Sequence, residues 1–146
     1  MGWFIFMILA WSAALLLVPI RHWKRHWPVG IFGMASIYAI DSTLIYLHAF
    51  SFYYRGISVS GLPLHFWLSY LPGGIIFDYF IPPDNIRKPL YIMVAAALLL
   101  AIEIAMIYTG YFQHINWNAY RSHLLNVGGF IIIMWFAEWI HRRKIV

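Results

Sequence analysis

The sequence predicts an all-α integral membrane protein built from five transmembrane helices. Hydrophobic residues make up 63% of the 146-residue chain and charged residues only 10%, whereas soluble domains carry roughly 25% charged residues. The apolar residues gather in long runs, most of them close to the roughly 20 residues that a helix needs to cross a bilayer. A chain this short and apolar leaves no room for a second domain, so we expect one transmembrane domain over residues 1–146.

The chain contains no cysteine, which excludes disulfides, thiolate metal sites and cysteine nucleophiles. Its net charge of +5 is also common among nucleic-acid-binding proteins. Here, however, the basic residues flank apolar runs, where they record orientation in the membrane. We therefore predict a bilayer with anionic headgroups as the partner, and no nucleic acid.

The first predicted span covers residues 2–20 and the second residues 28–50. The first is uncharged, and its basic residues follow it rather than precede it, which favours an N-terminus outside the cell. At the second span, Pro28 suits the first turn of a helix. Gly30 and Gly33 give this helix a small face for close approach of a neighbour.

The third predicted span, residues 61–81, is interrupted by Pro72-Gly73-Gly74. Proline cannot donate a helical hydrogen bond and crowds the carbonyl four residues back, so the third helix should be broken there. Such a break must be buried in protein or face a wet cavity, which makes these three residues a candidate hinge. The remaining predicted spans cover residues 89–111 and 124–140, separated by a polar and aromatic loop.

The positive-inside rule decides whether the third span crosses. With five crossings, eight basic residues lie on the cytoplasmic side and two, Arg55 and Arg121, outside; the eight are Arg21, Lys24, Arg25, Arg87, Lys88, Arg142, Arg143 and Lys144. Without the third crossing, the later loops change sides and six basic residues lie outside. The count favours five spans with a cytoplasmic C-terminus.

Two acids are predicted at nearly the same height, close to the middle of the membrane. Asp41 is about 13 residues from the start of its span and Glu103 about 14 from the start of its own, at about 1.5 Å per residue. An acid there costs roughly 2.5–3.5 kcal/mol on insertion scales, so it should face the protein interior, either neutral or paired. Such a pair indicates a proton relay or a cation site. The alternative is that each acid hydrogen-bonds a neighbouring helix and holds the bundle together.

Two histidines could extend these acids into a polar path from the outside. His48 shares a helix face with Asp41 and Tyr38, and His65 lies near the outer end of the third span. Imidazole and carboxylate ligands suit a divalent metal, and His48 with His65 could instead hold a haem. No diagnostic spacing selects a metal or haem, and interfacial histidines that bind water are the simpler interpretation.

At the cytoplasmic side, Asp78 and Glu138 are expected to be structural, with Glu138 pairing with Arg142 four residues on. The basic residues at that side should contact anionic lipid headgroups; they are Arg21, Lys24, Arg25, Arg142, Arg143 and Lys144. On the outer side, Ser122 beside His123 does not make a nucleophile–base pair, because adjacent helical residues point in different directions.

Several short motifs span most of the chain: W-P-x-G at Trp27–Gly30, L-P-G-G at Leu71–Gly74, P-P-D-N at Pro82–Asn85 and W-F-A-E-W at Trp135–Trp139, together with the acids within the second and fourth spans. In this pattern the chain resembles a family of small multi-spanning membrane proteins of endospore-forming Gram-positive bacteria. The resemblance implies a bacterial cytoplasmic or spore membrane. The family has no assigned activity, so the resemblance supplies no catalytic residues.

The sequence thus favours a small membrane protein that moves a proton, a cation or a small ion-coupled solute, with Asp41, Glu103, His48, His65 and Tyr38 as the binding residues. The alternatives are a non-enzymatic accessory or assembly subunit and a metal- or haem-binding membrane protein. The pattern favours a non-enzymatic protein. Small faces at Gly30/Gly33 and Gly128/Gly129 predict a homo-oligomer.

Overall fold

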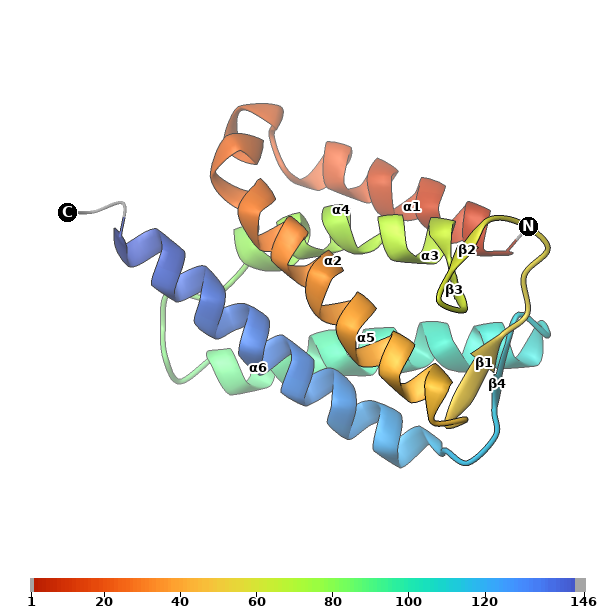
Figure 1. Cartoon of the computed structure of the whole chain (residues 1–146). Helices are drawn as coiled ribbons and strands as arrows, with labels where there is room; N and C mark the ends of the chain where they lie inside the picture. The colour runs from red at the N-terminus through yellow and green to blue at the C-terminus, as the bar shows by residue number, and fades with distance from the viewer. Residues whose placement is uncertain (1, 144–146) are drawn as a thin grey trace.

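The computed structural model describes residues 2–143, and most of them are helical (Figure 1). The helices are α1 (Gly2–Leu17), the short 3₁₀ helix η1 (Ile20–His22), α2 (Trp23–Tyr46), α3 (Leu64–Leu68), α4 (Tyr70–Tyr79), α5 (Lys88–Tyr108) and α6 (Ala119–Arg143). Four short strands form two antiparallel ribbons: β1 (Phe50–Phe52) with β4 (Phe112–His114), and β2 (Ser58–Val59) with β3 (Leu62–Pro63).

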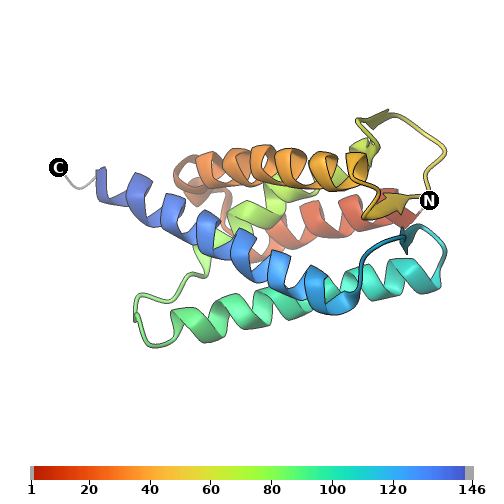
Figure 2. The same ribbon diagram turned by 60° about the horizontal axis from the view of Figure 1, so that its bottom comes forward.

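The chain runs back and forth along one helical bundle (Figures 1 and 2). The successive passes are α1, α2, α3 with α4, α5 and α6. One end of the bundle, the strand end, holds the start of α1, the end of α2 and all four strands. The opposite end, the basic end, holds the starts of α2 and α5 and the ends of α1, α4 and α6.

Three segments are long and apolar enough to cross a membrane: Ile20–Tyr46, Lys88–Tyr108 and Ala119–Arg142. In the most apolar window of α5, only 6% of the residues are buried inside the protein. Large apolar side chains such as Leu16 on α1 and Leu98 on α5 are exposed. These surfaces need an apolar solvent, as in a helical membrane protein. Helix α1 is apolar but shorter, with 16 residues.

Two glycines bring the backbones of α2 and α4 into contact. A Cβ atom on Gly30 would lie 2.6 Å from the carbonyl oxygen of Leu71, and one on Gly74 would lie 2.7 Å from Cα of Gly30. The small face predicted at Gly30 is therefore used inside the chain. It is not available to a second copy, contrary to its predicted part in a homo-oligomer interface.

The third pass is divided at one residue, Ser69, one turn before the break that the sequence predicts, and Ser69 keeps helical φ and ψ of −68° and −20°. The interruption lies at Ser69, between α3 and α4, while Pro72, Gly73 and Gly74 all belong to α4. The proline ring crowds the carbonyl four residues back, which is that of Leu68. The steric effect therefore ends α3 at that residue, and the predicted hinge residues themselves are helical.

Two helices also begin earlier than predicted. Helix α2 starts at Trp23, so Pro28 lies inside the helix and not in its first turn. Helix α6 starts at Ala119, within the predicted loop. The side-chain oxygen of Asn118 accepts a hydrogen bond from the backbone N–H of Arg121 at 2.8 Å, which is the interaction of an N-cap residue.

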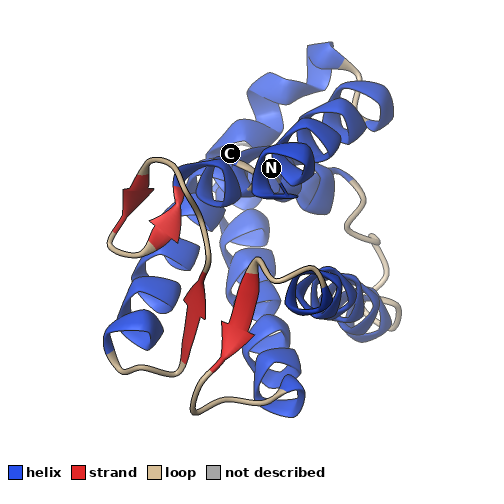
Figure 3. Ribbon diagram, turned by 90° about the vertical axis from the view of Figure 1, so that its right-hand side faces the viewer, coloured by secondary structure: helices blue, strands red, loops and turns tan. Residues whose placement is uncertain are grey.

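The strands at the strand end are absent from the all-α prediction (Figure 3). In the β1–β4 ribbon, Phe52 is opposite Phe112, and Ser51 is opposite Gln113. The Gln113 amide donates a 3.1 Å hydrogen bond to the hydroxyl of Ser51. Aromatic and polar residues thus alternate with the period of a strand. Each segment is only three residues long, and the ribbon forms where the two segments pair.

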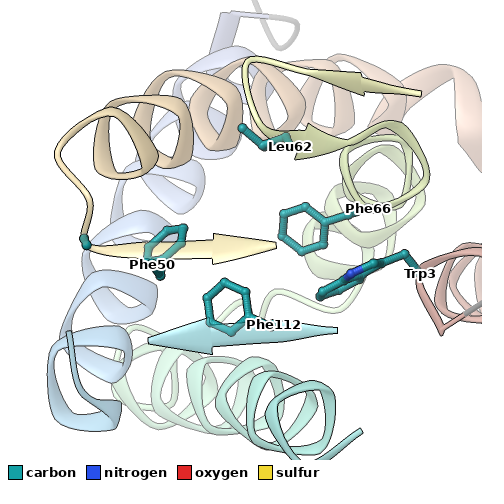
Figure 4. Close-up of a cluster of buried hydrophobic side chains, with 6 residues drawn as sticks. Trp3, Phe50, Leu62, Phe66 and Phe112 are labelled. Carbon is teal, nitrogen blue, oxygen red and sulfur yellow. The ribbon is translucent and has the colours of Figure 1, made fainter. Parts of the chain in front are cut away.

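Aromatic side chains from distant parts of the chain form a core beneath these strands (Figure 4). Trp3 of α1 packs on Phe66 of α3 with ring centroids 4.8 Å apart. Phe50 of β1 and Phe112 of β4 pack with centroids 5.1 Å apart. This aromatic core joins the strand ribbon to α1 and α3.

The glycine contact predicts a matched set of stability changes. We expect Gly74→Ala or Gly30→Ala to destabilise the protein by about 1–3 kcal/mol, because the added methyl group meets backbone and the helices must separate. Gly73→Ala is the control, because no described atom of another helix lies within 4 Å of the position that its methyl group would take. Thermal unfolding in detergent should show a lower Tm for the first two variants only. Equal Tm values for Gly73→Ala and Gly74→Ala would contradict the close contact.

Candidate functional site

Asp41 and Glu103 line one small cavity near the strand end, which we call the acid cavity. Its volume is about 60 Å³. A water molecule needs roughly 10–15 Å³ of such space, so a few waters or one small ion would fit. Tyr70, Ser122 and Asn126 also contribute to the lining. The two acids that the sequence places at one height therefore share a cavity.

Asp41 projects from α2 and is 5% exposed. None of the residues that the structure describes donates a hydrogen bond to its carboxyl group. A buried polar group without a partner is unfavourable for stability. This carboxyl group therefore has no structural bond to account for its position, in contrast to the alternative that it holds the bundle together.

Glu103 is held by a directed chain of hydrogen bonds. The indole N–H of Trp117 donates to the hydroxyl of Ser122 at 2.7 Å, and that hydroxyl donates to Oε1 of Glu103 at 2.9 Å. The Nε2 atom of His114 lies 3.5 Å from the same oxygen. Within residues 2–143, the buried Oε2 atom has no hydrogen-bond partner. One oxygen is thus fixed, while the other is unpaired.

The acids lie nearer to one end of their helices than the sequence predicts. Asp41 is five residues before the end of α2 at Tyr46, and Glu103 is five residues before the end of α5 at Tyr108. Their equal height agrees with the prediction. The shift toward the strand end arises because both helices end before the predicted limits of their spans, and α2 also begins earlier.

The predicted polar path through His48 and His65 is not formed. The acid cavity is walled instead by aromatic rings: Trp3, Phe6, Phe50, Phe52, Phe66 and Phe112. His48 is exposed after the end of α2 and has a positive φ of 58°. His65 is hydrogen-bonded to the hydroxyl of Tyr54, and Tyr38 is hydrogen-bonded to Ser60 at 3.0 Å. None of the three predicted residues lines the acid cavity.

A second, apolar cavity adjoins the acid cavity on the side of the basic end. It has a volume of about 50 Å³ and lies between α2, α4, α5 and α6. Tyr70, Leu99 and Asn126 are among the residues that line both cavities. Beyond them the lining is almost entirely apolar, so the polar region stops short of the basic end.

A second polar cluster, the histidine–aspartate cluster, lies at the basic end. Asp78 of α4 is 5% exposed and accepts hydrogen bonds from His26 of α2 at 2.6 Å and from His141 of α6 at 2.7 Å. Asp78 thus pairs across helices with two histidines. In the sequence, His26 and His141 stand beside basic residues that are predicted to contact lipid, and nothing in the sequence singles them out as partners of Asp78. The signal that could have found the cluster is the predicted topology, which places all three residues on one side of the membrane.

Other charged groups at the basic end form local pairs. Glu138 is paired with Lys88 of α5 and not with Arg142 as predicted. Four of the basic residues predicted to contact lipid have exposed side chains: Arg21, Lys24, Arg25 and Arg142. Arg143 ends α6, and Lys144 lies outside the described residues.

Comparison of the chain with protein-family models, curated proteins and solved structures found no match.

The hydrogen bonds at Glu103 predict a specific loss of stability. We expect Ser122→Ala to cost about 1–3 kcal/mol, because it leaves a buried indole N–H and a buried carboxyl oxygen without their shared partner. Ser42→Ala is the matched control, since Ser42 bonds only to carbonyl groups of its own helix. Chemical or thermal unfolding in detergent should separate the two variants. An unchanged Tm for Ser122→Ala would show that the chain of bonds contributes nothing.

Proposed function

We propose that this chain is a five-span membrane protein that moves protons or small cations through the acid cavity. Its N-terminus would lie outside and its C-terminus in the cytoplasm. The observation that carries the proposal is that buried Asp41 and partly buried Glu103 line one cavity. Each acid has at least one carboxyl oxygen to which no described residue donates a hydrogen bond. Intramembrane acids facing a cavity are typical of ion and proton pathways.

The charge distribution supports this orientation. Seven basic residues lie at the basic end, and Arg55 and Arg121 lie at the strand end; the seven are Arg21, Lys24, Arg25, Arg87, Lys88, Arg142 and Arg143. Cytoplasmic loops carry the excess of Lys and Arg in membrane proteins. The basic end is therefore assigned to the cytoplasm and the strand end to the outside.

The size of the cavity narrows the proposed substrate. About 60 Å³ holds a few waters or a small ion, which argues against a larger solute bound at this position. The apolar cavity on its cytoplasmic side separates the acids from the basic end. A continuous wet path would leak, whereas an apolar constriction can block ions until it is hydrated. Tyr70 and Asn126 lie at the boundary between the two cavities.

The resemblance to membrane proteins of endospore-forming bacteria supports a bacterial cytoplasmic or spore membrane as the location. The proposed homo-oligomer would use the face of α6 at Gly128, since no atom of another helix lies within 4 Å of a methyl group built there. Gly129 lines the apolar cavity inside the bundle instead. An accessory or assembly subunit is the rival function. It is distinguished by the flux measurement below.

The flux prediction uses purified protein in liposomes with a pH-sensitive dye inside and an imposed potassium diffusion potential. Asp41→Asn and Glu103→Gln should each reduce proton flux tenfold or more, because an amide of similar size cannot exchange a proton at that position. Repeating the measurement with Na⁺ and K⁺ gradients separates proton movement from cation movement.

Asp84→Asn is the matched control for these variants, because it also removes one carboxylate but lies exposed in the loop before α5. It should retain wild-type flux. Wild-type flux in both cavity variants, or no flux above that of empty liposomes for any form, would exclude the transport function. Loss of stability or of a copurifying protein in these variants, with flux unaffected, would support the accessory subunit.

The absence of cysteine allows the topology to be tested with single-cysteine variants. Ser58→Cys and Ile115→Cys should react with a membrane-impermeant maleimide on intact cells, because both exposed positions lie at the strand end. Asn85→Cys, exposed between α4 and α5, should react only after permeabilisation. Labelling of Asn85→Cys and Ser58→Cys from the same side would show that α3 and α4 do not cross.

A further inference from the structure

We propose that His26, Asp78 and His141 bind a divalent metal ion of the zinc class at the basic end of the bundle. The proposal uses none of the residues of the acid cavity, so it does not depend on the transport function. Its basis is the convergence of two imidazoles and one carboxylate from three different helices, with one ligand atom from each within 4.8 Å of the others.

The packing of α2 against α4 sets this arrangement. The two helices run antiparallel and touch at Gly30 and Gly74. His26 precedes Gly30 by four residues, and Asp78 follows Gly74 by four residues, so both lie one helical turn from the contact, on the same side of it. The glycine contact thus places the imidazole and the carboxylate opposite each other. His141, from the end of α6, completes the set.

The distances are compatible with an ion replacing the hydrogen bonds. Asp78 Oδ2 lies 2.6 Å from Nδ1 of His26 and 2.7 Å from Nε2 of His141. Around a tetrahedral zinc ion, ligands at about 2.0–2.2 Å from the metal lie roughly 3.3 Å apart. The two hydrogen-bonded pairs need to lengthen by less than about 1 Å to admit the ion. The two imidazole nitrogens, which lie within 4.8 Å of each other, would adopt the same ligand spacing. Binding would require each neutral imidazole to carry its proton on the ring nitrogen that faces away from the metal, so the nitrogen now bonded to the carboxylate becomes the ligand.

The burial of the cluster favours a fixed site. His26 is 7% exposed and Asp78 is 5% exposed, so the side chains are held by the surrounding helices. The ring of Tyr79 packs edge-on against His26 with centroids 5.5 Å apart. Among residues 2–143, the buried Nδ1 atom of His141 has no hydrogen-bond partner. The hydrogen bonds to Asp78 therefore leave one imidazole nitrogen of the cluster unsatisfied.

The ligand types select the class of metal. Imidazole suits zinc and its first-row neighbours, whereas calcium and magnesium prefer oxygen ligands. Three protein ligands also leave one position open, as in zinc sites that bind water or substrate. The cluster borders a pocket of about 610 Å³ at the basic end, which gives an ion access. Arg25 and Arg142 line the same pocket, so an anionic ligand such as hydroxide or a phosphate oxygen is favoured at the open position.

Zinc binding to protein in detergent micelles tests the proposal. The protein should carry no polyhistidine tag and should first be treated with a chelator that is then removed. Titration calorimetry with ZnCl₂ should give one ion per chain with a micromolar or lower Kd. His26→Asn, His141→Asn and Asp78→Asn should each weaken binding at least tenfold. His48→Asn is the control, because His48 is exposed at the other end and asparagine tolerates its positive φ.

A purely structural hydrogen-bonded cluster gives different results. In that case the three variants would lower the Tm of the metal-free protein, and zinc would not change the Tm of the wild type. The metal site requires zinc to raise the Tm of the wild type and of His48→Asn, but not that of Asp78→Asn. If a ligand variant does not fold, cobalt binding to the wild type decides. Tetrahedral Co²⁺ absorption at one ion per chain supports the site, and its absence together with no zinc binding overturns it.

Discussion

The contact between the backbones of α2 and α4 determines much of this structure. Lipid supplies no hydrophobic driving force between helices, so association rests on close packing and hydrogen bonds. At Gly30 and Gly74 the absence of side chains lets the two backbones touch. The contact sets how α2 and α4 lie against each other. The pairing of His26 with Asp78, one helical turn from the contact on each helix, depends on that arrangement.

The two ends of the bundle solve the problem of buried polar groups in different ways. At the basic end, Asp78 is balanced by two imidazoles, and every interaction crosses between helices. Near the strand end, Glu103 is only partly satisfied by Ser122, and Asp41 has no donor among the residues described. An acid whose carboxylate is hydrogen-bonded on both sides stabilises a helix interface, whereas unpaired acids on a cavity are costly. Sites of function are where such a cost is commonly found.

The strands and aromatic rings explain how the acid cavity is covered near the end of a short bundle. The rings of Trp3, Phe66 and Phe112 cover the acid cavity on the side of the strand end. Their packing depends on the β1–β4 ribbon. This ribbon pairs two segments that are distant in the sequence, since Ser51 and Gln113 are 62 residues apart. Of the three covering residues, only Phe112 lies outside the predicted spans, whereas Trp3 and Phe66 belong to α1 and α3.

The sequence by itself determined the membrane class, the order of the apolar segments and the equal heights of Asp41 and Glu103, because hydropathy and helical rise depend only on local residues. It also marked the third pass as broken, although Pro72 acts on the carbonyl four residues before it and so shifts the break to Ser69. Only the tertiary structure decided which polar groups meet. His26, Asp78 and His141 are far apart in the chain, and their convergence depends on the packing of three helices. For the same reason, His48 and His65 were assigned to a path that the aromatic core occupies instead.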